Sequence, residues 1–186
     1  MFITNHALAG AAIGLATRRP AAAFVAGIAS HVAMDMVLHW GDDLDWEAFV
    51  EVAKIDGAVG LGVCAGLLAT TPTAALPAVA AGIAGACLID MDKPGVHFFG
   101  RSPFPRAVDR FHGRIQHQRP AGWLVEAGTA VALVAALSPV LSRRARRRRR
   151  SGRYGARAVS PEVTTWQRST PAARSRPVAN GTRSTA

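Results

Sequence analysis

Five apolar runs, separated by short charged connections, leave this chain few ways to fold. Most of the runs approach the roughly 20 residues that an α-helix needs to cross a bilayer, although the first and third are short for a span. Ala and Gly are frequent in them, and small side chains allow helices to pack closely in lipid. The runs cover residues 2–17, 21–39, 56–69, 74–90 and 121–141. This pattern predicts an all-α, polytopic helical membrane protein with about four or five transmembrane helices.

A soluble bundle of buried, Ala-rich helices is the alternative fold. The helices of such a bundle carry a polar face, on which opposite charges pair at positions i and i+4. The runs at 74–90 and 121–141 contain almost no charges of this kind. The sequence therefore favours the membrane protein.

Charge divides the chain into two parts at residue 143. The whole chain has a net charge of +10, and 13 of its 22 basic residues but only one of its 12 acidic residues lie beyond residue 142. We therefore expect a helical transmembrane domain at 1–142 and a disordered, arginine-rich tail at 143–186. The tail is expected to contact anionic lipid head groups. Nucleic acid is a less favoured partner, because no folded nucleic-acid module accompanies the arginines.

The charges also suggest which side of the membrane each connection faces. By the positive-inside rule, Arg18, Arg19 and the arginine tail would be cytoplasmic, and the acidic loop at 40–55 external. The N-terminus and the polar link at 91–120 then lie outside, although that link contains six basic residues. Ionisable groups gather on the same side: His6, His31, Asp35, His39, Asp56, Asp90, Asp92, His97, His112, His117 and Glu126. Such groups are rare in membrane spans, so their convergence indicates a functional site.

The strongest candidate site is the end of the second run, where His31, Asp35 and His39 follow one another at i, i+4 and i+8. On a helix these side chains stack along one face, and an i, i+4 pair can share a metal ion. The first and third lie about 12 Å apart along the axis. Either one pair binds an ion and the third residue supports it, or two ions are held. A hydrogen-bonded helix end without a metal is the alternative.

Asp90 and Asp92 form a second candidate at the end of the fourth run. Pro94 is predicted to stop the helix there, which would leave both carboxylates at a helix end. A solvated helix end is the alternative to a metal site.

Residues 105–118 are predicted to form an amphipathic helix at the membrane surface. One face would be apolar and the opposite face basic, with Val108, Phe111 and Ile115 against Arg106, Arg110, Arg114 and His117. Arg110 and Arg114 either face anionic lipid head groups or hold an anionic substrate, such as a phosphoester, beside the metal.

The remaining candidates are isolated residues. His6 is the best of them, because it precedes an Ala- and Gly-rich helix without competing polar groups, whereas Asp56 and Glu126 suit a structural or supporting role. Cys64 and Cys87 are expected to be unpaired packing residues. The first residues lack a basic region, so no removable signal peptide is expected.

Four short motifs resemble those of the YdjM-like family of bacterial membrane-bound metal-dependent hydrolases. Asn5-His6 resembles its N-terminal His. The stretch Ile89-Asp90-Met91-Asp92-Lys93-Pro94 resembles a Pro-Asp-x-Asp-His-Pro element, with Ile89 and Lys93 replacing Pro and His. The stretch His112-Gly113-Arg114-Ile115-Gln116-His117 resembles a His-Arg-x-x-Thr-His element, with Gln116 replacing Thr. Ser30-His31 with Asp35 resembles a Ser-His-x-x-x-Asp element, which follows the other two in the family pattern.

The resemblance implies a membrane-bound hydrolase that uses a divalent metal ion, located as a multi-pass protein in the bacterial inner membrane. Mixed His and carboxylate ligands suit Zn²⁺ or Mn²⁺, which would lower the pKa of a bound water to about 7. The candidate metal ligands are His6, His31, Asp35, His39, Asp90, Asp92 and His117. Asp35, Asp92 and His112 are the candidate catalytic residues, and Arg110 and Arg114 the candidate substrate-binding residues. The expected substrate is a phosphoester or a lipid-like molecule.

The alternative function is not enzymatic. In a membrane scaffold or a proton-coupled transport protein, the same His and Asp groups would hold structure or relay protons. The sequence contains neither a Gly-x-Ser-x-Gly nucleophile elbow nor a Walker-type phosphate loop.

Overall fold

Helices make up nearly all of the described protein, as the sequence predicts. The computed structural model describes residues 1–41 and 44–158, and these ranges contain no strand beyond an isolated bridge between His39 and Gln118. The elements in chain order are α1 (Ile3–Thr17), α2 (Pro20–Asp35), α3 (Trp46–Thr70), η1 (Thr73–Ala75), α4 (Leu76–Cys87), η2 (Ile89–Met91), α5 (Asp92–Phe99), α6 (Arg106–Ile115), η3 (Pro120–Gly122) and α7 (Trp123–Ala158).

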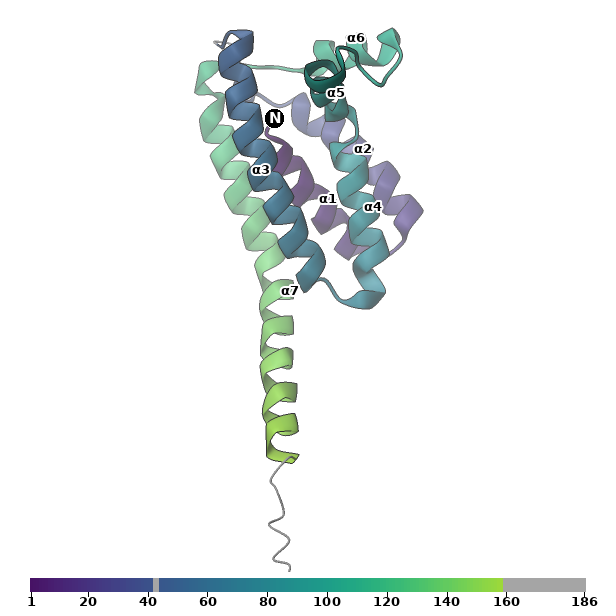
Figure 1. Cartoon of the computed structure of the whole chain (residues 1–186), viewed down its shortest axis with the longest axis vertical. Coiled ribbons are helices and arrows are strands. Elements are labelled where there is room, and N and C mark those ends of the chain that lie inside the picture. The colour runs from purple at the N-terminus through teal and green to yellow at the C-terminus, as the bar shows by residue number, and fades with distance from the viewer. Residues whose placement is uncertain (42–43, 159–186) are drawn as a thin grey trace, which may run out of the picture.

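Helix α1 is the centre of the bundle, although it is short (Figure 1). It packs against α2, α3, α4 and α7, and α2 also packs along α4. Side chains from α1, α3, α4 and α7 meet in the core: Ala7, Leu8, Ala11, Leu67, Val79, Ile83 and Leu137. Cys64 and Cys87 are free and pack at the edge of this core, which agrees with the prediction of unpaired packing cysteines.

Glycines allow α1 and α2 to approach α4 at backbone distance. A methyl group on Gly10 would collide with the backbone carbonyl of Gly82, and a methyl group on Gly27 would meet the same carbonyl from α2. The three helices can therefore pack closely only because these positions lack a Cβ, as in small-residue interfaces of membrane helices. This packing fixes how the ends of α1, α2 and α4 lie relative to one another.

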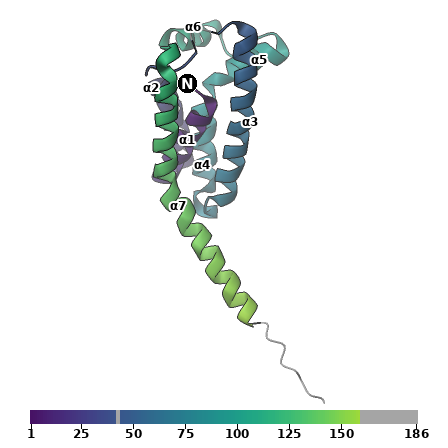
Figure 2. The same ribbon diagram turned by 90° about the vertical axis from the view of Figure 1, so that its left-hand side faces the viewer.

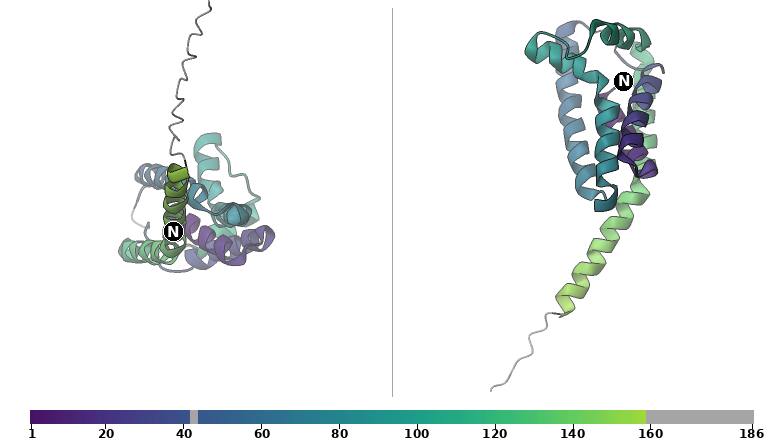
Figure 3. Two further views of the ribbon diagram at one scale, coloured as in Figure 1. Left: turned by 90° about the horizontal axis from the view of Figure 1, so that it is seen from below. Right: turned by 90° about the vertical axis from the view of Figure 1, so that its right-hand side faces the viewer.

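The short helices α5 and α6 cover the end of the bundle at which α1 begins (Figures 2 and 3). The path from α4 into α5 bends by 55° at η2. The sequence predicts that Pro94 ends a helix, and this prediction is wrong. Helix α4 already ends at Cys87, and Pro94 lies in the first turn of α5, where the missing N–H has no intrahelical partner to lose.

The third apolar helix begins earlier than predicted. Asp45 caps the N-terminus of α3 by accepting a hydrogen bond from the backbone N–H of Ala48 at 2.8 Å, so the helix starts at Trp46. Glu47 and Glu51, which fall in the predicted external acidic loop, are therefore helical. At 25 residues α3 is also not short for a span.

Two helical segments are long and apolar enough to cross a membrane, or three if the bent pair is one span. They are Trp46–Thr70 and Pro120–Pro139, and the bent pair is Thr73–Cys87 with Ile89–Phe99. Helices α1 and α2, with 15 and 16 residues, are shorter than a typical span. The structure thus supports the coarse prediction of a helical protein with membrane-length helices, but not the number of four or five spans.

Helix α7 continues beyond the bundle to Ala158 (Figure 3). The predicted disordered tail begins at Arg143, so its first part is helical in the structure. Ala and Arg are both strong helix formers. The rest of the predicted tail, residues 159–186, lies outside the described residues.

Candidate metal centre

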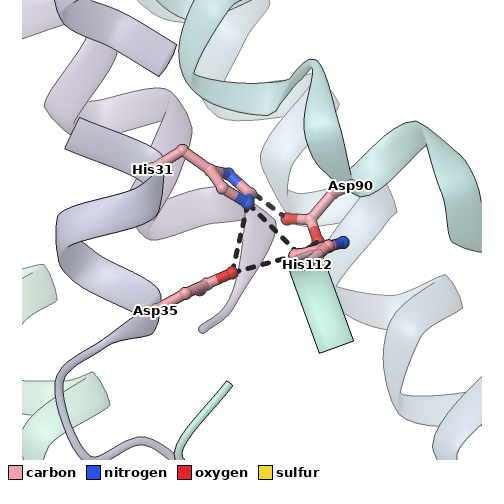
Figure 4. A group of neighbouring side chains, drawn as sticks. All are labelled: His31, Asp35, Asp90 and His112. Atoms are coloured by element: carbon pink, nitrogen blue, oxygen red, sulfur yellow. Dashed lines mark hydrogen bonds and ion pairs between the residues drawn. The ribbon is translucent and has the colours of Figure 1, made fainter. Parts of the chain in front are cut away.

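Four buried side chains from three elements converge near the start of α1. His31 and Asp35 come from α2, Asp90 from η2 and His112 from α6, and one ligand atom from each lies within 4.8 Å of the others (Figure 4). Within the described residues this is a group that could hold a metal ion. Because such groups are costly to bury unless they are paired or bind metal, the cluster requires an explanation.

The α-helical spacing of His31 and Asp35 brings their side chains together. The two residues are one turn apart, and His31 Nε2 lies 3.1 Å from Asp35 Oδ2. His112 approaches the same oxygen from α6, also at 3.1 Å. Asp35 therefore joins α2 to α6 through a single carboxylate oxygen.

Hydrogen bonds on the far side of each ring aim the Nε2 atoms of His31 and His112 into the cluster. His31 Nδ1 lies 2.7 Å from the carbonyl oxygen of Ala86, and His112 Nδ1 lies 2.8 Å from Asp92 Oδ2. Both partners only accept, so both Nδ1 atoms carry a proton. In the neutral rings the two Nε2 atoms then face each other as lone pairs, 3.3 Å apart. A backbone carbonyl or carboxylate behind a His is the usual support of a metal ligand.

The spacing of the three nearest ligand atoms matches a coordination shell. The two Nε2 atoms and Asp35 Oδ2 form a triangle with edges of 3.1, 3.1 and 3.3 Å. Ligand atoms bound about 2.0–2.1 Å from a tetrahedral Zn²⁺ are about 3.3 Å apart. The triangle formed by His31, Asp35 and His112 therefore has the size that an ion such as Zn²⁺ needs.

Asp90 faces this triangle from a longer distance. Its Oδ1 lies 3.7 Å from His112 Nε2 and 2.7 Å from the Lys93 ammonium, which also lies 3.6 Å from Asp92. Lys93 thus holds Asp90 by a charge-assisted hydrogen bond. A metal ion that binds Asp90 Oδ1 has to compete with this ammonium.

A proton at His112 stabilises the metal-free cluster. Burial disfavours the charged imidazolium, but hydrogen bonds to Asp35 and Asp92 outweigh burial and raise the pKa of His112 from 6.5 to about 9. At neutral pH the ring is therefore protonated and donates to both carboxylates. The side-chain amide of Gln116 lies 2.9 Å from the same Nε2. A metal ion would take the place of the Nε2 proton.

His6 lies beside the four-residue group. Its Nε2 is 3.2 Å from Asp35 Oδ1 and 3.8 Å from Asp90 Oδ2, and its ring stacks on that of His31 with centroids 4.1 Å apart. The ring is fully buried, and its Nδ1 has no hydrogen-bond partner among the described residues. The amine of Met1 also lies 2.9 Å from Asp35 Oδ1.

Two carboxylates from long helices fix the start of α1, and with it His6. Asp56 of α3 accepts hydrogen bonds from the backbone N–H groups of Ile3 and Thr4, at 2.6 and 3.4 Å. Glu126 of α7 accepts from the N–H of Phe2 at 3.2 Å and from the side chain of Asn5 at 2.7 Å. The first N–H groups of a helix lack intrahelical partners and favour negative charge. This capping explains why Asp56 and Glu126 are present, and it agrees with the supporting role predicted for them.

The structure does not bring His39 into the group. The prediction that His31, Asp35 and His39 share one helix face is wrong, because α2 ends at Asp35. The backbone of His39 pairs instead with the chain near His117, accepting from Arg119 N at 2.8 Å. Its side chain is buried, with Nδ1 2.8 Å from the carbonyl of Val37 and Nε2 without a partner among the described residues.

His117 and the two arginines also lie away from the cluster. Helix α6 ends at Ile115, and the side chain of His117 is exposed. Arg110 and Arg114 are exposed as well, and Arg110 lies about 160° around α6 from His112 at 100° per residue. Asp92 is placed behind His112 rather than inside the triangle. His97, which the sequence places on the same membrane side, is exposed.

Two contributors to the site are not among the candidate residues from the sequence. Lys93 and Gln116 depart from the family pattern that the motifs resemble, yet the side chains of both reach the cluster. The spacing of Lys93 from Asp90, three residues along a helical path, is a usable signal for an ion pair. The role of the Ala86 carbonyl has no sequence signal, because any residue supplies a carbonyl.

Comparisons with protein-family models, with curated proteins and with solved structures find no match. The described residues define a class on their own: a helical protein with two or three membrane-length segments and a buried His/Asp group that could hold a metal ion.

Proposed function

We propose that this protein is a membrane-bound, metal-dependent hydrolase. The observation that carries the proposal is the orientation of His31 and His112. Each ring has its Nδ1 hydrogen-bonded to an acceptor, and both Nε2 atoms point at one place beside Asp35 Oδ2. Once His112 loses its Nε2 proton, this arrangement sets three electron-pair donors around one point, as a metal site requires.

His31, Asp35 and His112 would hold the ion, and Asp90 would bind it directly or through a water molecule. The mixed nitrogen and oxygen donors fit Zn²⁺ or Mn²⁺. When bound, the ion supplies a water molecule of lowered pKa as the nucleophile. Asp92 acts through His112 as a positioning residue, because its contact is to the Nδ1 of that ring. The Ala86 carbonyl has the same role for His31.

A pocket beside the cluster supports a lipid-like substrate. It has a volume of about 670 Å³ and lies between α1, α3, α4 and α5. Its lining is mainly apolar, including Trp46, Phe49, Ile83 and Phe98, while Asp90 and Lys93 contribute charged groups. Such a lining suits a hydrocarbon chain whose polar head reaches the ligands. A phosphoester head group would be drawn to the Lys93 ammonium.

The arrangement of apolar surface supports a multi-pass membrane protein. Large apolar side chains are exposed on α3 and α7, including Ile55, Leu61, Leu124 and Val131. Exposed apolar helix faces of this extent suit contact with lipid. We propose that α1 and α2 complete the bundle as shorter, lipid-embedded segments. In line with the motif resemblance, we place the protein in a bacterial inner membrane.

Arg110 and Arg114 are assigned to the membrane surface rather than to the substrate. They are exposed on α6, on the side opposite His112. Helix α6 covers the end of the bundle, where it would meet anionic lipid head groups. The arginine-rich tail would have the same partners.

The test is the metal content of the full-length protein purified in detergent, measured by elemental analysis after dialysis against Zn²⁺ or Mn²⁺. We expect bound metal in the wild type and its loss in the variants His31→Ala and His112→Ala. His97→Ala is the matched control, because it removes an exposed histidine outside the group. Retained helicity by circular dichroism identifies variants that still fold.

Hydrolysis is then assayed with phosphoester and phospholipid substrates in mixed micelles. Activity that depends on the added metal and is lost in His31→Ala supports the hydrolase. A wild-type protein that binds no metal would contradict it. Proton-coupled flux in vesicles without hydrolysis would then favour the transport alternative, and neither activity would favour a scaffold.

A further inference from the structure

We propose that the cluster holds two divalent metal ions, with His6 as a ligand of the second. This inference rests on the proposed metal-dependent function and extends it. The second site would consist of His6 Nε2, Asp35 Oδ1 and Asp90 Oδ2. Asp35 and Asp90 would then bridge the two ions, each with one oxygen on either side.

The two oxygens of Asp35 face different histidines. Oδ2 lies 3.1 Å from the Nε2 atoms of both His31 and His112, whereas Oδ1 lies 3.2 Å from His6 Nε2. Each oxygen thus meets imidazole nitrogen at the distance between neighbouring ligands of one ion. Oδ1 also accepts a hydrogen bond from the Met1 amine at 2.9 Å, so an ion at this position has to compete with that ammonium.

The two oxygens of Asp90 also face different histidines. Its Oδ1 lies 3.7 Å from His112 Nε2, and its Oδ2 lies 3.8 Å from His6 Nε2. Each oxygen is thus nearest to the histidine that also faces the corresponding oxygen of Asp35. Both carboxylates thus separate His6 from His112 in the same order, which defines two adjacent positions; Asp90 Oδ2 also lies 4.0 Å from His31, but from the Nδ1 atom that faces the Ala86 carbonyl.

The stacking of His6 on His31 sets the distance between these positions. The ring centroids are 4.1 Å apart and the ring planes differ by 24°. Both rings direct Nε2 toward Asp35, one to each oxygen. Nearly parallel rings that bind separate ions through equivalent atoms hold those ions at about the ring separation. Two-metal hydrolytic sites have ions about 3.5–4 Å apart.

The second site is expected to be the weaker one. His31 and His112 each have an acceptor at Nδ1, whereas His6 Nδ1 has no partner among the described residues. A ligand histidine without such support binds metal less tightly, by about 10- to 100-fold in typical cases. The ions should therefore bind in sequence, first at His31 and His112 and then at His6.

The experiment is a Mn²⁺ titration of the full-length protein in detergent, followed by elemental analysis and electron paramagnetic resonance. We expect two ions per chain at saturation and a spin-coupled spectrum, because the ions would lie about 4 Å apart. The variants His6→Ala and His6→Gln should retain one ion with an uncoupled six-line spectrum. Their retained ion also shows that the first site is still folded. His97→Ala should behave as the wild type.

The outcomes separate this inference from the function on which it rests. One ion per wild-type chain with an uncoupled spectrum would overturn the second site and leave the hydrolase proposal standing. Loss of both ions in both His6 variants would place His6 at the first site and also overturn the assignment. No binding in the wild type would overturn both proposals.

Discussion

Metal binding at this cluster should depend steeply on pH, because His112 has to lose a proton to act as a ligand. Its pKa in the metal-free protein is about 9, raised from 6.5 by hydrogen bonds to Asp35 and Asp92 that outweigh burial. Nearly all molecules therefore carry this proton at neutral pH. The ion that binds His31 and His112 should release about one proton from His112, so its apparent Kd should improve about tenfold per pH unit up to about pH 9 and then level off.

The stability of the metal-free protein should fall as pH rises, whereas that of the metal-loaded protein should change little. A group whose pKa is raised on folding stabilises the protein fully below its unfolded pKa and loses that contribution as pH rises through its folded pKa. For His112 this window runs from 6.5 to about 9, and the contribution is about 3 kcal/mol at about 1.4 kcal/mol per pH unit. The metal-free protein should therefore melt at a lower temperature as pH rises through this window. Because metal affinity increases over the same pH range, the difference in stability between the metal-loaded and the metal-free protein should grow.

Isothermal titration calorimetry in detergent, repeated in buffers of different ionisation enthalpy, measures both the affinity and the number of protons released. Thermal melts followed by circular dichroism measure the stability trend. The variant Asp92→Asn is informative, because loss of the carboxylate lowers the pKa of His112 and should move the plateau of metal affinity to lower pH. An affinity that is constant between about pH 7 and pH 9 would refute the reasoning.

Three further changes test individual contacts. Lys93→Gln removes the ammonium that holds Asp90 Oδ1 at 2.7 Å, so metal affinity should rise several-fold by calorimetry; weaker binding would mean that Lys93 positions the carboxylate for the ion. His117→Ala should leave the metal content by elemental analysis unchanged, because this side chain is exposed. If the variant lost metal, His117 would be a ligand after all. Gly10→Ala places a methyl group against the backbone of α4 and should destabilise the protein by about 1–3 kcal/mol in thermal melts. Gly57→Ala, where a Cβ meets nothing within 4 Å, should be neutral or stabilising, and equal effects of the two substitutions would contradict the packing argument.

The sequence predicts which elements form more reliably than which residues meet. Apolar runs locate most of the helices, and the i, i+4 spacing of His31 and Asp35 brings their side chains together as expected. The same spacing wrongly predicts that His39 lies on this helix face, because nothing in the pattern indicates that α2 ends at Asp35. His39 therefore lies in a connection that pairs with the backbone after α6, an interaction between distant segments that periodicity does not encode.

The choice between His112 and His117 depends on tertiary structure in the same way. Both residues lie in the predicted amphipathic segment 105–118, and either could face the bundle by composition. Helix α6 ends at Ile115, so only His112 keeps a helical position on the buried side. The bend between α4 and α5 separates the positions of Asp90 and Asp92. Asp90 faces the cluster, and Asp92 contacts the Nδ1 atom of His112 from behind. The sequence alone does not show that two carboxylates so close together have different positions in the site.

Ionisable groups gather at one end of the bundle for two reasons: some cap the start of α1, and others form the buried His/Asp cluster. Asp56 and Glu126 belong to the membrane-length segments, and each satisfies backbone N–H groups at the start of α1. A helix that begins inside a bundle leaves those donors without partners, so carboxylates at this depth are a structural necessity of the short α1. Once α1 is fixed in this way, His6 faces Asp35 Oδ1 and Asp90 Oδ2, whereas His112 faces the other oxygen of each carboxylate. The capping carboxylates thus act on the buried His/Asp cluster indirectly, through α1, and their removal should displace His6 before it affects the triangle formed by His31, Asp35 and His112.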